Sequence, residues 1–163
     1  MTQLDLTDHN LYELDEMVMS NLKILHVGHN HIKSIPLLPP TLVELYCHEN
    51  KLIELPQLPD SLLFLVCYGN KITKIQLPNN LKHLRCDFTC KLNNIPWSLE
   101  TFDGWKPYAT KLKLEYHNIQ RKELGLLSVH KLPTKEEWDE IKTMYDYRIG
   151  GDKYLSFWKS HYP

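Results

Sequence analysis

"LPPTLVELYCHENKLIELPQLP", residues 38–59, sets apolar residues at short, regular intervals before an asparagine and closes on Leu-Pro pairs. The same arrangement returns along the chain. Its third leucine, Leu45, recurs at spacings of 20, 20 and 19 residues, at Leu25, Leu45, Leu65 and Leu84. A fixed period of this length indicates a repeat architecture, in which each repeat is one small structural unit.

The period continues beyond these four copies. "LDLTDHNLYEL" brings Leu4 and Leu6 into register 21 residues before the first clear copy, with His9 where the others have Asn. "LETFDGW" places Leu99 and Phe102 in register at the other end. We therefore expect about five repeats over residues 1–105.

Each repeat alternates apolar and variable residues, which is typical of a short strand with one buried face. Asn30, Asn50 and Asn70 follow the strands, where a side-chain amide can bond main-chain groups that a bend leaves without partners. Proline pairs such as Leu55-Pro56 favour an extended return path over a helix. The sequence predicts a mostly-β solenoid of the α/β type, with short parallel strands on the concave face and extended convex segments.

The skeleton LPxxLxxLxxxxNxLxxLPxLP, carried by residues 38–59 and 58–78, resembles the short, roughly 20-residue leucine-rich repeats of bacterial type III effectors. Repeat proteins of amoebae and of the giant DNA viruses that infect them look similar. The resemblance implies protein binding without chemistry. Some effectors join such repeats to a ubiquitin-ligase domain with a catalytic cysteine, but no cysteine follows Cys90, so that activity is not implied.

Composition narrows the classes of partner. The chain has 163 residues and a net charge of −1, which gives no overall field favouring nucleic acid or an acidic membrane surface. The N-terminal stretch has no signal-peptide pattern, and no segment is apolar for the length of a membrane span. We expect a cytoplasmic protein, in the host cytoplasm if it is an effector or viral protein; export by a leaderless route stays open.

"LYCHENKL", residues 45–52, raises the question of a nucleophilic site, because a thiol, an imidazole and a carboxylate are consecutive. The repeat register turns Cys47, Cys67 and Cys86 inward, where a thiol acts as a small hydrophobe. "HLRCDFTC", residues 83–90, holds metal-ligand residue types, but strand alternation separates His83 from Cys86. With one extra residue in this repeat, either Thr89 or Cys90 takes the Asn place. We predict no enzyme activity, no metal and no cofactor.

The variable strand positions form columns across the repeats, and they are rich in aromatic, histidine and arginine residues. Such enrichment is typical of protein-binding patches. Several histidines in the columns also allow a pH-sensitive surface. The alternative is that loops or the C-terminal segment cover the rings. The predicted partner-binding residues are Tyr46, Phe64, Tyr68, Phe88, Arg85, His26, His48, Glu44, Glu49 and Asp87.

Residues 106–163 depart from the period and are predicted to form a C-terminal cap with a strand and two short helices. "KLKLEYHNI", residues 111–119, alternates like a strand. Thr134 with Glu137 predicts a helix start, and Gly150 its end. A second short helix is expected from Asp152. Many large rings in this segment suit either a cap or a second docking element: Trp138, Tyr145, Trp158 and Tyr162.

These patterns favour a non-catalytic protein–protein interaction module that binds an unidentified protein through an aromatic, His-rich concave face. One alternative is a structural or assembly protein, for example virion-associated, that docks through its C-terminal aromatics and self-associates. Another is an adaptor to ubiquitin-pathway machinery. Neither nucleic acid nor membrane is an expected partner.

Overall fold

The computed structural model describes residues 2–15 and 19–149. The chain divides into two compact units, residues 1–109 and residues 110–163. The sequence placed its boundary between residues 105 and 106.

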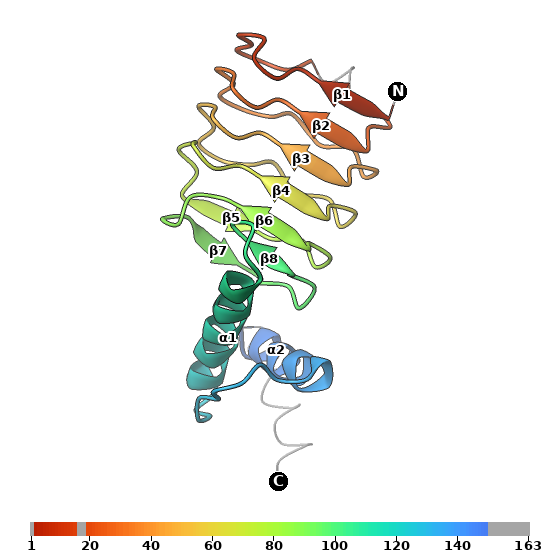
Figure 1. The fold of residues 1–163 in the computed structure, drawn as a ribbon. Helices are drawn as coiled ribbons and strands as arrows, with labels where there is room; N and C mark the ends of the chain where they lie inside the picture. Colours follow the sequence, from red (N-terminus) through yellow and green to blue (C-terminus); the bar gives the residue numbers. More distant parts are fainter. Residues whose placement is uncertain (1, 16–18, 150–163) are drawn as a thin grey trace. The chain divides into compact units, whose positions relative to one another are not determined.

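The first unit is a solenoid with a parallel sheet along one side (Figure 1). Within the described residues the sheet has six strands, each contributed by one coil and paired in the order β1-β2-β3-β4-β6-β8. A separate pair, β5 and β7, joins two return segments. The strands are β1 (Gln3–Asp5), β2 (Ile24–His26), β3 (Glu44–Tyr46), β4 (Phe64–Val66), β5 (Lys74–Gln76), β6 (His83–Arg85), β7 (Lys91–Asn93) and β8 (Thr101–Phe102).

The strand register confirms the period predicted from the sequence. Leu25, Leu45, Leu65 and Leu84 lie side by side as Cα partners on adjacent strands, and all four are fully buried. Burying a leucine side chain contributes about 1.5–3 kcal/mol. Because each coil adds further buried leucines and an inward residue of the Val27, Cys47, Cys67 and Cys86 column, stacking the coils supplies the core that a single coil lacks.

A ladder of asparagine side chains holds the turn after each strand, as the sequence predicted. The Asn50 Nδ2 group donates to the Val27 carbonyl of the preceding coil at 2.8 Å and to Cys47 O at 3.2 Å. Its Oδ1 atom accepts the Ile32 N–H at 3.0 Å. Asn30 and Asn70 make the corresponding bonds in their coils. The ladder therefore fixes both the turn within a coil and its spacing to the next coil.

The residue before each ladder asparagine has a left-handed backbone. The φ angles are 53° at His29, 52° at Glu49 and 67° at Gly69, and Asp8 in the first coil has 59°. Residues other than glycine rarely adopt this conformation, so the surrounding hydrogen bonds must impose it. In the first coil His9 stands at the Asn place, with its Nδ1 atom 2.6 Å from Thr7 O.

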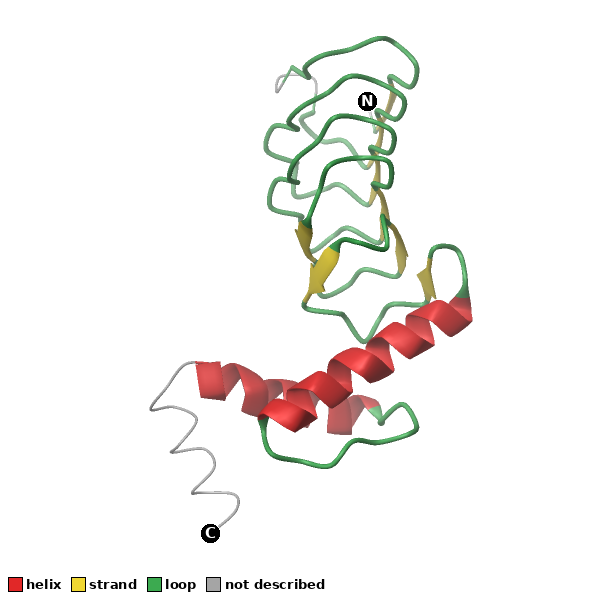
Figure 2. Cartoon of the chain, turned by 90° about the vertical axis from the view of Figure 1, so that its left-hand side faces the viewer, coloured by secondary structure: helices red, strands yellow, loops and turns green. Residues whose placement is uncertain are grey.

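The return segments run extended along the side opposite the six-stranded sheet (Figure 2). Hydroxyl groups help to connect successive coils here: Thr41 Oγ1 donates to Leu22 O at 2.8 Å, and Ser61 Oγ donates to Leu42 O at 2.6 Å. The sequence predicted the extended path. It did not predict the pairing of β5 with β7.

The fifth coil, which contains β6, accommodates its extra residue through Asp87. The carboxylate of Asp87 accepts the N–H groups of Gly69 at 3.1 Å and Asn70 at 3.4 Å, where earlier coils use main-chain carbonyls. Cys90 donates its N–H to the Asp87 carbonyl, closing a short turn. Asp87 thus replaces main-chain carbonyls and not the ladder amide, so which of Thr89 and Cys90 takes the Asn place stays a prediction.

The predicted strand at residues 111–119 is wrong, because these residues lie within helix α1 (Lys106–Glu123). Pro107 suits the first turn of a helix. The buried His117, Gln120 and Leu124 recur at helical spacing. Gly125, with φ 75°, ends the helix, and the Leu126 N–H donates to Arg121 O in a Schellman-type closure. The alternation of "KLKLE" masked this longer period.

The helix predicted from Thr134 is confirmed as α2 (Lys135–Ile149). Thr134 Oγ1 accepts the Glu137 N–H at 3.2 Å while the Glu137 carboxylate accepts the Thr134 N–H at 2.8 Å, which is a capping box. Ile141 and Met144 pack with Leu124 in a small apolar core. The helix predicted from Asp152 lies outside the described residues, and the capping role of this unit stays a prediction.

We predict that Asn50→Ala lowers the free energy of unfolding by about 1–3 kcal/mol, because main-chain groups buried in two coils lose their partner. Urea denaturation measures this change. Asn80→Ala is the matched control, since the Asn80 amide makes one exposed bond, to Asp60 O, and its loss should cost less than about 0.5 kcal/mol. Equal losses in the two variants would contradict the structural role of the ladder.

Candidate functional site

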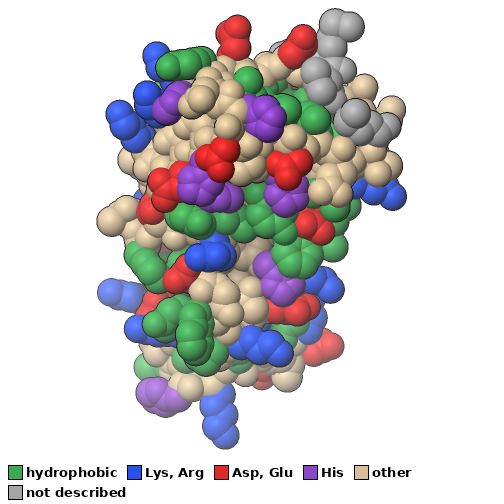
Figure 3. Space-filling model, turned by 45° about the horizontal axis from the view of Figure 1, so that its top comes forward, with side chains coloured by type: hydrophobic (Ala, Val, Ile, Leu, Met, Phe, Trp, Pro, Cys, Tyr) green, Lys and Arg blue, Asp and Glu red, His purple; other side chains and the backbone are tan. Residues whose placement is uncertain are grey.

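The outward side chains of the strands and of the turns that follow them form one surface, called the strand face below (Figure 3). The strand register sets Glu44 beside Phe64 and Phe64 beside His83. It also sets His26 beside Tyr46. All ten residues predicted to bind a partner lie in the solenoid unit. Seven are half-buried, and Glu49, Arg85 and Phe88 are exposed.

Aromatic rings on neighbouring strands stack face to face across the strand face. The His26 and Tyr46 rings are 4.3 Å apart and tilted by 2°. The Phe64 and His83 rings are 4.2 Å apart and tilted by 21°. Stacking buries the faces of these rings against each other. The stacking holds these rings in fixed positions on the surface.

Tyr46 has its hydroxyl engaged on the same surface. The hydroxyl donates to Glu44 Oε2 at 2.8 Å. Burial and, after it, the hydrogen bond to Glu44 raise the pKa of Tyr46 to about 12. The phenol therefore stays protonated at neutral pH, with its donor directed at Glu44 and its ring orientation fixed.

His48 contacts aromatic rings on both neighbouring coils. Its ring stacks on Tyr68 at 5.1 Å and meets His29 edge-on at 5.0 Å. The Arg85 guanidinium lies 5.0 Å from the Tyr68 ring centre, in a cation–π arrangement. Gly28 makes room for the imidazole, since a Cβ there would come within 2.6 Å of His48 Cε1. Sequence reasoning did not single out Gly28, although it is the one glycine in its column.

The pKa of His48 is lowered from its ordinary value of 6.5, chiefly by burial and then by His29. Glu49 opposes this shift, and Arg85 and His26 add to it. The Nδ1 atom is buried without a hydrogen-bond partner in the described residues. His48 is therefore neutral at physiological pH.

The remaining predicted residues divide between structural and peripheral positions. The Asp87 carboxylate is committed to Gly69 and Asn70. The Glu49 carboxylate lies against Gly69, within 2.7 Å of where a Cβ would stand. Phe88, 70% exposed, contacts Phe102 and Tyr108 edge-on. Trp105 and Tyr108 extend this peripheral aromatic group; the sequence signal, "FDGWKPY" at residues 102–108, was not used.

The three buried cysteines have low reactivity. Burial raises the pKa of Cys47 and of Cys86 to about 12, and the pKa of Cys67 well above its ordinary value. Thiolate, the reactive form, is therefore scarce at neutral pH. Among residues 2–15 and 19–149, no three His, Cys, Asp or Glu side chains come together as a metal site would require.

The coil geometry, the register of the buried leucines and the asparagine ladder define a leucine-rich-repeat solenoid, a fold that typically serves protein interaction. Among solved structures the chain is similar to YopM from Yersinia enterocolitica WA-314, with 40% sequence identity and a TM-score of 0.54. The match covers 57% of this chain and 21% of that one, so it spans about a fifth of YopM. It supports the repeat part of the resemblance to effector proteins.

No protein-family model matches the chain, and no curated protein matches it. Within the described residues, no helix combines the length and the apolar composition needed to cross a bilayer.

We predict that His48 titrates below pH 6.5 in the folded protein, because burial disfavours the imidazolium ion. The unfolded chain therefore binds more protons at His48 than the folded chain does. The contribution of His48 to the free energy of unfolding is full above pH 6.5, and it falls as the pH drops from 6.5 to the lower pKa of the folded state. Proton NMR of the imidazole C2–H measures it, with the same chain in concentrated urea as the control. A folded-state value at or above the unfolded one would refute the assigned environment.

Cys47, Cys67 and Cys86 should resist alkylation by iodoacetamide at mildly alkaline pH, since burial suppresses their thiolates. The half-exposed Cys90 should react first. Mass spectrometry of the labelled peptides, with the urea-unfolded chain as reference, gives the order. Rapid native labelling of Cys47 would reopen the nucleophile hypothesis for "LYCHENKL".

Proposed function

We propose that this chain is a non-catalytic interaction module that binds a partner protein through the strand face. The observation that carries the proposal is the pre-positioned pair of stacks, His26 on Tyr46 and His48 on Tyr68. Tyrosine and arginine are the residue types that dominate binding energy in protein interfaces, and Arg85 lies beside the second stack.

The binding energy would come from burial of ring edges that are already ordered. Holding a free aromatic side chain in one rotamer costs entropy on association, and stacking removes most of that cost beforehand. The polar groups around the rings, His26, His48, Glu44 and Arg85, would set the orientation of the partner. Both signs of charge are present, which favours a partner surface of mixed charge.

Two of the predicted residues have a weaker claim within this proposal. Asp87 already accepts two main-chain N–H groups, so it supports the surface rather than contacting the partner. Phe88 belongs to the peripheral group with Phe102 and Tyr108. We assign it to the rim of the interface.

Assembly through the C-terminal aromatics is the less favoured function. Trp138 is 2% exposed and stacks with His117, so it serves the helical unit itself. Light scattering over a range of concentrations separates this alternative from partner binding. The partner we propose is a cytoplasmic protein, of the host if the chain acts as an effector or viral protein; a role as adaptor to ubiquitin-pathway machinery is one form of this function.

The double variant Tyr46→Ala/Tyr68→Ala should abolish capture of the partner by the purified chain from native or host lysate, because it removes the centre of both stacks. Quantitative mass spectrometry of the captured proteins measures the loss. Tyr12→Ala is the control, since Tyr12 is an exposed tyrosine beside His31 in the turn region.

Gly28→Ala adds a gentler probe, because a methyl group there displaces the His48 ring without removing it. We expect weakened capture. Melting temperatures of all variants should stay within a few degrees of one another. Undiminished capture by the folded double variant would overturn the strand-face assignment.

A further inference from the structure

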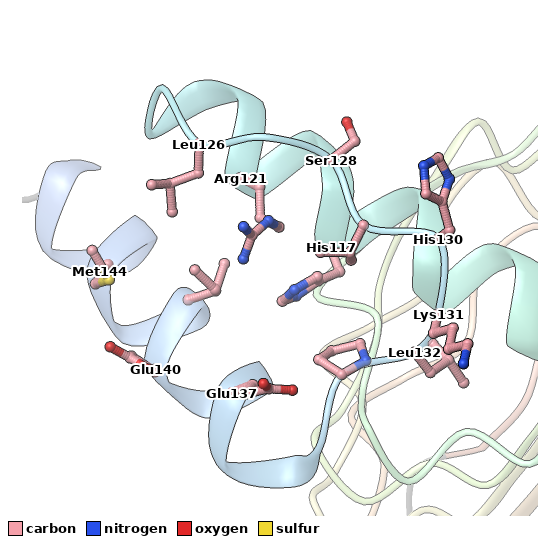
Figure 4. Close-up of a pocket in the computed structure, with 13 residues that line it drawn as sticks. His117, Arg121, Leu126, Ser128, His130, Lys131, Leu132, Glu137, Glu140 and Met144 are labelled. Atoms are coloured by element: carbon pink, nitrogen blue, oxygen red, sulfur yellow. The ribbon is translucent and has the colours of Figure 1, made fainter.

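The helical unit contains a cavity of about 800 Å³ between α1, the segment that follows it and α2 (Figure 4). This volume is in the range of sites that hold ligands. Much of its wall is apolar, contributed by Leu126, Val129, Leu132, Ile141 and Met144.

His117 is the unusual member of the wall. Its imidazole points from α1 into the cavity, beside Arg121 (Figure 4). The side chain is 1% exposed, and neither ring nitrogen has a hydrogen-bond partner within the described residues. Buried polar groups are nearly always bonded, so the free chain leaves a vacant donor and a vacant acceptor.

The chemistry of these vacancies is specific. Burial, and after it Arg121, lowers the pKa of His117, so the ring is neutral and offers one N–H and one lone pair. Its face is covered by Trp138, at 5.4 Å and 14°, which leaves the ring edge for a ligand. The ring therefore offers one donor and one acceptor as a cavity-lining group. A peptide group, with one N–H and one carbonyl, complements such groups.

Opposite charges flank the apolar wall. Arg121 uses its Nε–H for Leu127 O at 2.6 Å, leaving its terminal amino groups for other acceptors. Lys131 lies apart from Arg121, beside Leu132, and α2 contributes the carboxylates of Glu137 and Glu140 (Figure 4). A ligand that fits this arrangement carries an apolar group and an acidic group placed to meet Arg121.

We propose that this cavity is a second binding site, independent of the strand face, for a peptide segment of another protein. An apolar side chain packs against the wall formed by Ile141 and Met144, the adjoining peptide group bonds His117, and a neighbouring carboxylate meets Arg121. An ordered water could satisfy the imidazole alone. It would leave the apolar wall wet and Arg121 unmatched.

The probe is a displayed library of random peptides of about twelve residues, selected on the full chain. The best peptide is then titrated by fluorescence anisotropy. His117→Phe keeps a ring on Trp138 but removes both nitrogens, and should weaken binding by about tenfold or more. Arg121→Gln should reduce the preference for an acidic residue. Tyr46→Ala/Tyr68→Ala, altered only on the strand face, should bind as the unaltered chain does.

Ring nitrogen NMR gives a readout that does not depend on any variant folding. The His117 ¹⁵N signals should move on peptide addition. The Ser128→Trp variant places a large ring at an exposed position in the cavity lining and should block the cavity. If the library is enriched no better on the unaltered chain than on this variant, the proposal is overturned. It is also overturned if the His117 signals do not move on peptide addition, because the site would then hold water only. If the selected peptides no longer bind the Tyr46→Ala/Tyr68→Ala variant, they bind the strand face. That result would refute this second site and leave the proposed function intact.

Discussion

The hydrogen bonds of Asn50 and its equivalents are the constraint on which the solenoid depends. Each amide joins the carbonyl at the end of one strand to main-chain groups of the coil before it. The turn that results holds the preceding residue in a left-handed conformation, at His29 and Glu49. The direction in which the turn side chains leave the sheet follows from that geometry, so the ladder sets the form of the strand face as well as the spacing of the coils.

The same strand register determines which residues form the core and which form the strand face. Inward positions carry leucine and cysteine and give an inert, closely packed interior. Outward positions one residue away carry Tyr46, which stacks on His26, and His48, which stacks on Tyr68. "LYCHENKL" brings together groups that would make a nucleophilic site if they shared a side of the strand. The fold separates them, and the imidazole becomes part of the strand face.

Much of this was accessible from the sequence because the period repeats at Leu25, Leu45 and Leu65, which fixes the inward or outward direction of each residue. What escaped prediction lacks such repetition. Residues 111–119 satisfy both a strand and a helix pattern locally, and only the buried His117, Gln120 and Leu124 decide for the helix. The fit of His48 over Gly28 and the cavity between α1 and α2 depend on distances between coils or helices, which spacing along one chain does not encode.

The central claim is that the strand face is the surface that a partner protein covers. Hydrogen–deuterium exchange of the chain, free and in complex with the captured partner, tests it most directly. The account predicts added protection in residues 24–29, 44–49, 64–69 and 83–88, the segments that end each strand and begin each turn. Protection confined to the return segments of the solenoid, with these four unchanged, would contradict it.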